Sequence, residues 1–146
     1  MNQDLMFSSK KMDWETPQEL FEQLNEKYRF DIDVAASAEN SKCEIFFTEQ
    51  DDALSKEWNG NIFCNPPYGR QLGKWLEKAY SEHQRDPDRA IVFLIPARTD
   101  TNYWHDYVFG KAEIDFLRGR LYFENNGIKI DRAPFPSAVV VYGKVS

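Results

Sequence analysis

Residues 61–68 read NIFCNPPY, a short apolar run that ends in an asparagine, two prolines and a tyrosine. The apolar part has the character of a buried strand. Neither Pro66 nor Pro67 has a backbone N–H, so a strand in the interior of a sheet cannot continue through them. Residues 72–83 then carry apolar side chains at helical spacing. This stretch predicts a buried strand, a rigid turn and an amphipathic helix, in that order.

The composition is that of a folded globular protein. The 146 residues are 42% hydrophobic, and the apolar runs are too short to cross a bilayer. The N-terminus lacks the apolar core of a secretory signal, and Cys43 and Cys64 form neither a disulfide framework nor a metal-binding spacing with the two histidines. We therefore expect a soluble, reduced, cytosolic protein without a metal.

The charge is unevenly distributed along the chain. The net charge of −6 disfavours a nucleic-acid partner. Residues 1–60 hold 6 basic and 14 acidic residues, whereas residues 61–146 hold 12 basic and 10 acidic ones. A mildly basic second half is compatible with DNA that contacts only one face of the protein.

Strand and helix patterns alternate along most of the chain. A helix is expected at 17–28, with Thr16 as its N-cap and Glu19 completing a capping box. A further helix is expected at 101–110, and strands at 28–34, 43–48, 61–64, 90–95, 113–117, 120–123, 128–130 and 137–143. The pattern predicts an α/β fold with a mostly parallel, mixed sheet and an antiparallel C-terminal hairpin that turns at 124–127. Ligands of such sheets bind at the carboxyl ends of the strands.

The turn Asn65–Tyr68 has two interpretations. It is either a plain strand-ending turn, or a site that captures an exocyclic amine such as N6 of adenine. In the second case the Asn65 side-chain oxygen and the Pro66 carbonyl accept both amine hydrogens and expose the nitrogen lone pair. Tyr68 would offer a face to a flipped-out base. With an activated methyl donor, this chemistry needs no metal and no nucleophilic side chain.

Five segments in a fixed order resemble a known family. They are DWETPQELFEQLN (13–25), FDIDVAASAENSKCEIFFT (30–48), DDALSKEW (51–58), NPPYGRQLGKWLEKA (65–79) and PSAVVVY (136–142). In this set the chain resembles the phage-type DNA N-6-adenine methyltransferases, the Dam family of bacteriophages. The resemblance implies an abbreviated three-layer, Rossmann-like fold that uses S-adenosylmethionine (AdoMet). It also implies one catalytic domain over 1–146, with no separate target-recognition domain, in which Asn65, Pro66, Pro67 and Tyr68 bind the target amine.

The other segments are then expected to build the AdoMet pocket, in which Asp33 suits the amine of the methionine moiety. The expected cofactor-binding residues are Trp14, Thr16, Asp33, Ala35, Ala36, Asp51 and Asp52. Alternatives stay open: Thr16 as an ordinary cap, the two alanines as tight packing, and one of the adjacent aspartates as a solvated loop charge. The glycine-rich loop of the broader methyltransferase pattern is absent, and DVAAS stands in its place.

Double-stranded DNA is the expected partner. The candidate DNA-binding residues are Arg70, Arg98, Arg118 and Arg120. Without a separate recognition domain, we expect a short recognition sequence, relaxed specificity, or a homodimer or accessory protein that completes target recognition. The expected location is the cytoplasm, which is that of the host if a phage encodes the chain. Two alternatives remain, namely an RNA or protein amino-methyltransferase and a non-catalytic, acidic, methyltransferase-like binding protein. A role in restriction–modification follows only from the resemblance.

Overall fold

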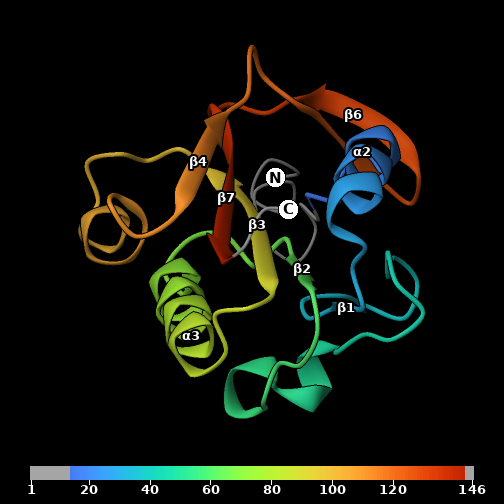
Figure 1. Ribbon diagram of the computed structural model, residues 1–146. Helices are drawn as coiled ribbons and strands as arrows, with labels where there is room; N and C mark the ends of the chain where they lie inside the picture. The colour runs from blue at the N-terminus through green and yellow to red at the C-terminus, as the bar shows by residue number, and fades with distance from the viewer. Residues whose placement is uncertain (1–13, 144–146) are drawn as a thin grey trace.

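The central strand of the protein is β3 (Ala90–Pro96), in which every residue is buried. The computed structural model describes residues 14–143, and the expectation that concerns the N-terminal stretch falls on residues outside this range. The main sheet also contains β1 (Ile32–Asp33), β2 (Ile62–Cys64), β4 (Glu113–Phe116) and β7 (Ser137–Gly143), in the order β1-β2-β3-β7-β4 (Figure 1). The first three strands are parallel, and β7 runs antiparallel to both β3 and β4. The expected α/β fold with a mixed sheet is confirmed.

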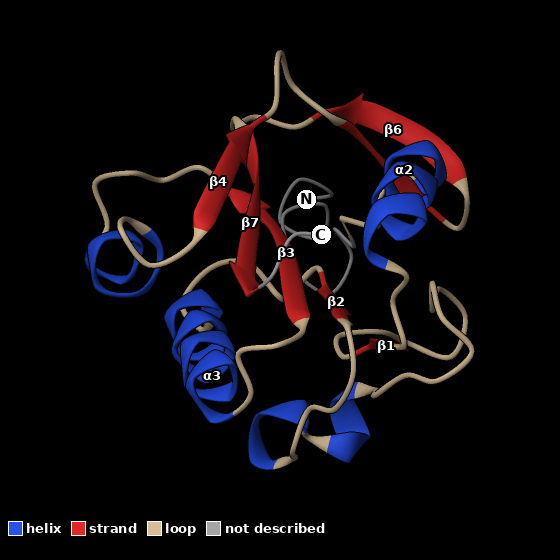
Figure 2. Ribbon diagram, viewed as in Figure 1, coloured by secondary structure: helices blue, strands red, loops and turns tan. Residues whose placement is uncertain are grey.

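Alternate residues of β3 face two different layers of side chains, because successive side chains of a strand point to opposite faces. Ile91, Phe93 and Ile95 pack with α3 (Leu72–Arg85). Val92 and Leu94 belong to a second cluster, which includes residues of α2 (Gln18–Tyr28), β5 (Tyr122–Asn125) and β6 (Ile128–Arg132). Figure 2 shows the strands at the centre, with helices around them. Burial on both faces explains why β3 reads as a continuous apolar run.

The expected helices form with differences in length. The helix α3 buries Leu72, Trp75, Leu76 and Ala79, as its apolar spacing predicts. The expected helix at 101–110 is helical only over residues 102–108, most of which form a π-helical turn, η3 (Trp104–Val108). Two 3-10 turns, η1 (Glu49–Asp51) and η2 (Ala53–Ser55), connect β1 to β2. No helix within residues 14–143 has the length and apolarity that a membrane span requires.

Two expectations were wrong. The stretch 43–48 is not a strand, because only Phe46 forms a bridge, to Asp33, and the two-residue β1 offers no longer edge for pairing. Thr16 is not the N-cap of α2 and forms no capping box, because Pro17 occupies the N-cap and makes no side-chain cap bond. The Thr16 hydroxyl contacts Asn65 instead.

The expected hairpin is confirmed but lies outside the main sheet. Strands β5 and β6 form a two-stranded sheet of their own. Their two-residue turn has Asn126 at φ 55° and Gly127 at φ 79°, the left-handed backbone of a tight hairpin turn. The hairpin therefore packs as a separate ribbon, and β4 and β7 supply the antiparallel part of the main sheet.

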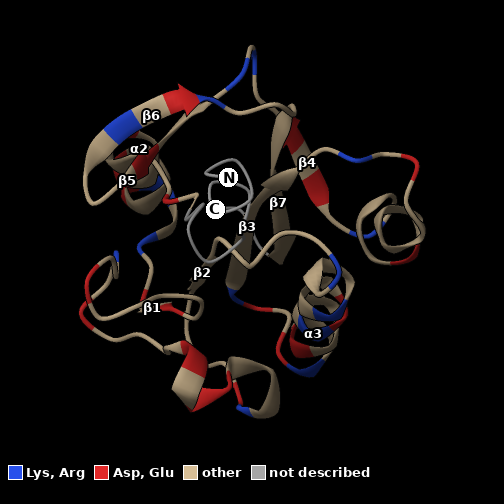
Figure 3. Cartoon of the chain, turned by 180° about the vertical axis from the view of Figure 1, so that it is seen from behind, with Lys and Arg blue, Asp and Glu red and all other residues tan. Residues whose placement is uncertain are grey.

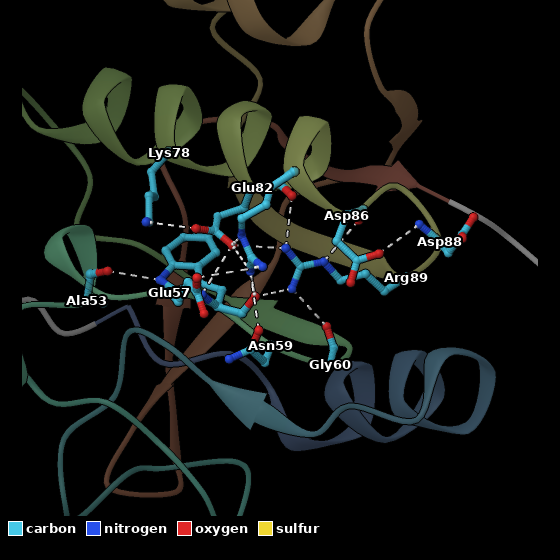
Figure 4. A network of polar contacts seen from close by, with 11 residues as sticks. Ala53, Glu57, Asn59, Gly60, Lys78, Glu82, Asp86, Asp88 and Arg89 are labelled. Atoms are coloured by element: carbon cyan, nitrogen blue, oxygen red, sulfur yellow. Dashed lines mark hydrogen bonds and ion pairs between the residues drawn. The ribbon is translucent and has the colours of Figure 1, made fainter.

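Glu82 of α3 is the centre of a buried ionic network (Figure 4). It accepts hydrogen bonds from Lys78 at 2.9 Å, Arg85 at 2.7 Å and Arg89 at 3.0 Å. The backbone N–H of Trp58 donates to the same carboxylate at 3.2 Å. Burial raises the pKa of Glu82, but these hydrogen bonds outweigh it and lower the pKa to about 2. The network fastens α3 to the loop that leads into β2.

Replacing Glu82 with glutamine removes the charge that three cations share. We expect the free energy of unfolding at neutral pH to fall by about 3 kcal/mol, because the cations would remain partly buried without their counter-ion. The matched control is Glu77→Gln, which changes an exposed glutamate of the same helix and should shift stability by less than about 0.5 kcal/mol. Urea denaturation measures both differences.

The same network predicts a pH dependence. The pKa of Glu82 is lowered from 4.5 to about 2, so its stabilisation is present above pH 4.5 and is lost as the pH falls towards 2. The stability difference between the wild type and Glu82→Gln should shrink over that interval. An equal difference at neutral pH and at a pH of about 3 would contradict this assignment.

Candidate active site

A cavity of about 610 Å³ lies where β1 and β2 end. The parallel register pairs Asp33 with Phe63, and the N–H of Val34 donates to the Phe63 carbonyl at 3.1 Å. Asp33 and Asn65 therefore leave neighbouring strands at the same edge of the sheet. Among the expected site residues, those that line the cavity are Trp14, Thr16, Asp33, Ala35, Ala36, Asp52, Asn65, Pro66, Pro67, Tyr68 and Arg70.

Asp33 is a buried carboxylate that organises the loop after β1. One oxygen accepts from the N–H of Ala35 at 3.2 Å, and the other from the N–H of Lys42 at 3.0 Å. Burial raises the pKa of Asp33, although these two N–H groups and the Lys42 charge act in the opposite direction. A cationic ligand in the cavity would favour the ionised carboxylate. Asp33 is therefore both a loop-forming residue and the buried anion of the cavity.

The Asn65 side chain is held by the N-terminal segment. Its Nδ2 donates to the Trp14 carbonyl at 2.5 Å and to the Thr16 hydroxyl at 3.1 Å. No hydrogen bond within residues 14–143 uses Asn65 Oδ1 or the carbonyl oxygen of Pro66. Two acceptors that follow each other in the chain are thus unused beside the cavity.

Tyr68 is held by a hydrogen bond of its hydroxyl and by the packing of its ring. Its hydroxyl donates to the Leu94 carbonyl of β3 at 3.1 Å, and burial raises its pKa well above the ordinary value. The phenol therefore stays neutral and acts as a donor. The ring packs edge-on against Phe123 at 6.3 Å and Phe135 at 5.7 Å, and Trp14 packs against the same two rings. We call these four residues the aromatic cluster.

Cys64, at the end of β2, does not provide a nucleophile. It is fully buried, and burial, together with the nearby Asp33, raises the pKa of its thiol well above the ordinary value. Of the two prolines that follow, Pro66 is buried and Pro67 is exposed. The turn therefore presents a backbone carbonyl and an amide, rather than an ionised nucleophile, to the cavity.

The two adjacent aspartates differ in position. Asp51 accepts from the N–H of Thr48 at 2.8 Å and from its hydroxyl at 3.1 Å, and these bonds lower the pKa of Asp51. Asp51 is absent from the cavity lining, whereas Asp52 and Glu49 belong to it. The capping bond at Asp51 turns its carboxylate back towards its own 3-10 turn.

The four candidate arginines fall into two groups. Arg70 lines the cavity, and the guanidinium of Arg98 lies 5.8 Å from the centre of the Phe135 ring, beside the aromatic cluster. Arg118 and Arg120 are exposed and belong to the connection between β4 and β5. This connection runs along the outside of the molecule, beyond the end of β4 (Figure 3). Neither of these two arginines lines the cavity. Arg70 and Arg98 are therefore the two that lie near the Asn65–Tyr68 turn.

Several residues around the cavity carried no signal in the sequence. Lys42 donates its backbone N–H to Asp33 and its ammonium to Gln18 at 2.8 Å. Phe123 and Phe135 come from the hairpin and from the chain before β7, far along the sequence from Tyr68. Their apolar character predicted only core positions, because local patterns do not tell which core residue packs against Tyr68.

A mixed α/β sheet, a buried aspartate after its first strand and an Asn-Pro-Pro-Tyr turn after the next are the arrangement expected of the amino-methyltransferase class. Within that class, the family model for DNA N-6-adenine-methyltransferase (Dam) matches residues 5–143. The chain therefore belongs to this family.

Two phage proteins illustrate the similarity. The chain is 31% identical over 123 residues to the DNA N-6-adenine-methyltransferase of Escherichia phage T1, which covers 82% of this chain and 50% of the phage protein. It is 28% identical over 135 residues to the DNA N-6-adenine-methyltransferase of Haemophilus phage HP1 (strain HP1c1), which covers 88% of this chain and 77% of that protein. The match thus spans half the length of the T1 protein.

Proposed function

We propose that the protein transfers a methyl group from AdoMet to the N6 amine of adenine in double-stranded DNA. The observation that carries the proposal is the pair of unused acceptors, Asn65 Oδ1 and the Pro66 carbonyl, beside a cavity that also contains the buried Asp33 carboxylate. Family membership and the names of the two phage relatives support the same reaction. The proposal includes an abbreviated, three-layer, Rossmann-like fold in a single catalytic domain.

The residues of the cavity fit the cofactor. A volume of about 610 Å³ lies within the range of small-molecule sites. Asp33 supplies a buried anion for the methionine amine, and Ala35 and Ala36 are small enough for backbone to approach the ligand. When bound, AdoMet supplies an electrophilic methyl group on a sulfonium.

Other contacts to the cofactor follow from the lining. We assign the ribose hydroxyls to Asp52 in preference to Asp51, because Asp52 lines the cavity and Asp51 does not, and Glu49, which also lines it, is the alternative acid. Trp14 is a candidate for the adenine ring and belongs to the lining. Thr16, expected among the cofactor-binding residues, also lines the cavity, but its hydroxyl accepts a hydrogen bond from Asn65. No step is assigned to a metal.

The protein acts on the target amine by orientation. Asn65 Oδ1 and the Pro66 carbonyl accept the two hydrogens of N6, and the lone pair of the nitrogen then points at the methyl carbon. Bound AdoMet would supply the methyl group to this nitrogen, and the electron pair of the broken sulfur–carbon bond would stay on sulfur. The proton leaves the alkylated nitrogen afterwards, to water, so Cys64 and Tyr68 stay protonated throughout. Tyr68 stacks on the flipped base.

DNA contacts are assigned to the basic residues near the turn. Arg70 and Arg98 lie close enough to the cavity and the aromatic cluster to meet the phosphates around a flipped adenine, while Arg118 and Arg120 contact the backbone further away. A second copy or an accessory protein completes target recognition. As a DNA-modifying enzyme, the protein acts in the cytoplasm, which is that of the host if a phage encodes the chain.

Replacing Asn65 with alanine tests the proposal directly. We expect the wild type to form N6-methyladenine in adenine-unmethylated DNA, and the rate to fall on the order of 100-fold or more in Asn65→Ala, because a preorganised transition-state contact is lost. Nucleoside mass spectrometry of DNA incubated with AdoMet measures the product. Asn59→Ala, the same change at an exposed position outside the cavity, is the control and should keep wild-type activity.

The alternatives are separate outcomes of this experiment. Methyl incorporation into RNA or protein, but not into DNA, would replace the proposed substrate. Failure of the wild-type protein to bind AdoMet or its demethylated product in calorimetry would instead indicate a non-catalytic, methyltransferase-like binding protein.

Replacing Asp33 with asparagine tests the cofactor site. We expect the affinity for S-adenosylhomocysteine, the demethylated product, to fall by about tenfold or more, because a hydrogen bond to a charged group contributes roughly 1.5–3 kcal/mol. Burial raises the pKa of Asp33 in the free protein. The affinity of the wild type for S-adenosylhomocysteine should therefore weaken as the pH falls through the pKa of Asp33, because the carboxyl becomes protonated. Asp33→Asn should lack this dependence. Calorimetry measures both effects, with the exposed Asp115→Asn as control, and an unchanged affinity in Asp33→Asn would refute the assignment.

A further inference from the structure

The segment Trp14–Thr16 lies between the Asn65–Tyr68 turn and the β5–β6 hairpin. On one side it accepts both hydrogen bonds of Asn65 Nδ2, through the Trp14 carbonyl and the Thr16 hydroxyl. On the other side, Glu15 exchanges two backbone hydrogen bonds with Glu124 of β5, at 3.1 and 3.0 Å. The segment is therefore anchored on a hairpin more than a hundred residues away in the chain.

These contacts determine which way the Asn65 amide points. A backbone carbonyl only accepts hydrogen bonds, so the Asn65 atom 2.5 Å from the Trp14 oxygen has to be the nitrogen. A primary amide has two N–H hydrogens, and the Trp14 carbonyl and the Thr16 hydroxyl use both. Oδ1 is left with its lone pairs free. An amide rotated by 180° would place oxygen against the Trp14 carbonyl, so the segment selects one orientation.

We propose that Thr16 is a positioning residue for amine capture, which holds the Asn65 amide with its oxygen free for the target adenine. The inference rests on the proposed function of Asn65. Thr16 is 2% exposed, so water does not compete for the hydroxyl. An acceptor that is held in one orientation before the substrate arrives needs no reorganisation during the reaction. This role differs from the direct contact to the cofactor that the sequence predicts for Thr16.

The β5–β6 hairpin holds the segment Trp14–Thr16 on the side that faces away from Asn65. The N–H of Asn126, in the hairpin turn, donates to the Glu15 side chain at 3.0 Å. The Trp14 ring packs edge-on against Phe123 of β5 at 5.4 Å. Backbone pairing, a side-chain bond and aromatic packing therefore fix the segment that in turn fixes Asn65.

Kinetics of two Thr16 variants distinguish positioning from cofactor binding. Thr16→Val keeps the branched shape but removes the hydroxyl, and we expect kcat to fall roughly tenfold while the Kd for S-adenosylhomocysteine stays within about twofold. Thr16→Ser restores the hydroxyl and should recover kcat to within about threefold. Thr99→Val, at an exposed position outside the cavity, is the matched control. An unchanged kcat in Thr16→Val would overturn the proposal. So would a rise in the Kd for S-adenosylhomocysteine that accounts for the whole loss of activity.

A second measurement does not depend on catalysis. In ¹⁵N NMR spectra of the wild type, the two side-chain N–H₂ protons of Asn65 should exchange with water more slowly than those of the exposed Asn59. The reason is that both Asn65 protons are hydrogen-bonded, to the Trp14 carbonyl and the Thr16 hydroxyl. In Thr16→Val one of the two protons should lose this protection. Equally fast exchange at Asn65 and Asn59 overturns the proposal even if Thr16→Val fails to fold. Slow exchange in a wild type that methylates no adenine would support the positioning contact and refute the proposed function alone.

Discussion

Two consecutive residues without a backbone N–H are the constraint on which the site depends. Pro66 and Pro67 cannot donate to the ladder, so β2 ends at Cys64 while the longer β3 continues beside it to Pro96. The chain leaves the sheet at the edge where β1 ends, which the parallel pairing of Asp33 with Phe63 fixes. The cavity, its buried carboxylate and the amide of Asn65 share one place because these two strands end together.

The site is closed by segments from both ends of the described chain. Trp14 and Thr16 come from before the first helix, and Phe123 and Phe135 from beyond the fourth strand of the sequence. Each contacts a residue of the Asn65–Tyr68 turn, through hydrogen bonds or aromatic packing. For the proposed reaction, in which the protein orients the amine, this enclosure is the main contribution of the fold. A neutral tyrosine, a buried thiol and a fixed amide are consistent with such chemistry.

The local patterns succeeded where neighbours in sequence decide the structure. The apolar stripe of α3, the continuous apolar run of β3 and the turn at Asn126 depend on spacing and backbone preference within a few residues. They failed where a distant contact outweighed a local one. The pattern around Thr16 is that of a capping box, but the hydroxyl bonds to Asn65, a residue 49 positions away. Residues 43–48 have the composition of a strand, but β1 is too short to pair with them.

Apart from the strand wrongly expected at 43–48, the sequence by itself determined the order of the main strands and helices, the point at which β2 ends and the chemical nature of the turn, because these follow from periodicity and from the missing N–H groups of proline. It also contained the ordered motifs that place the chain in its family. Only the tertiary structure decided that Asp52, rather than Asp51, lines the cavity and that the Asn65 amide turns its oxygen away from Trp14 and Thr16. The physical reason is that orientation and enclosure arise from contacts between segments far apart in the chain, which no local pattern encodes.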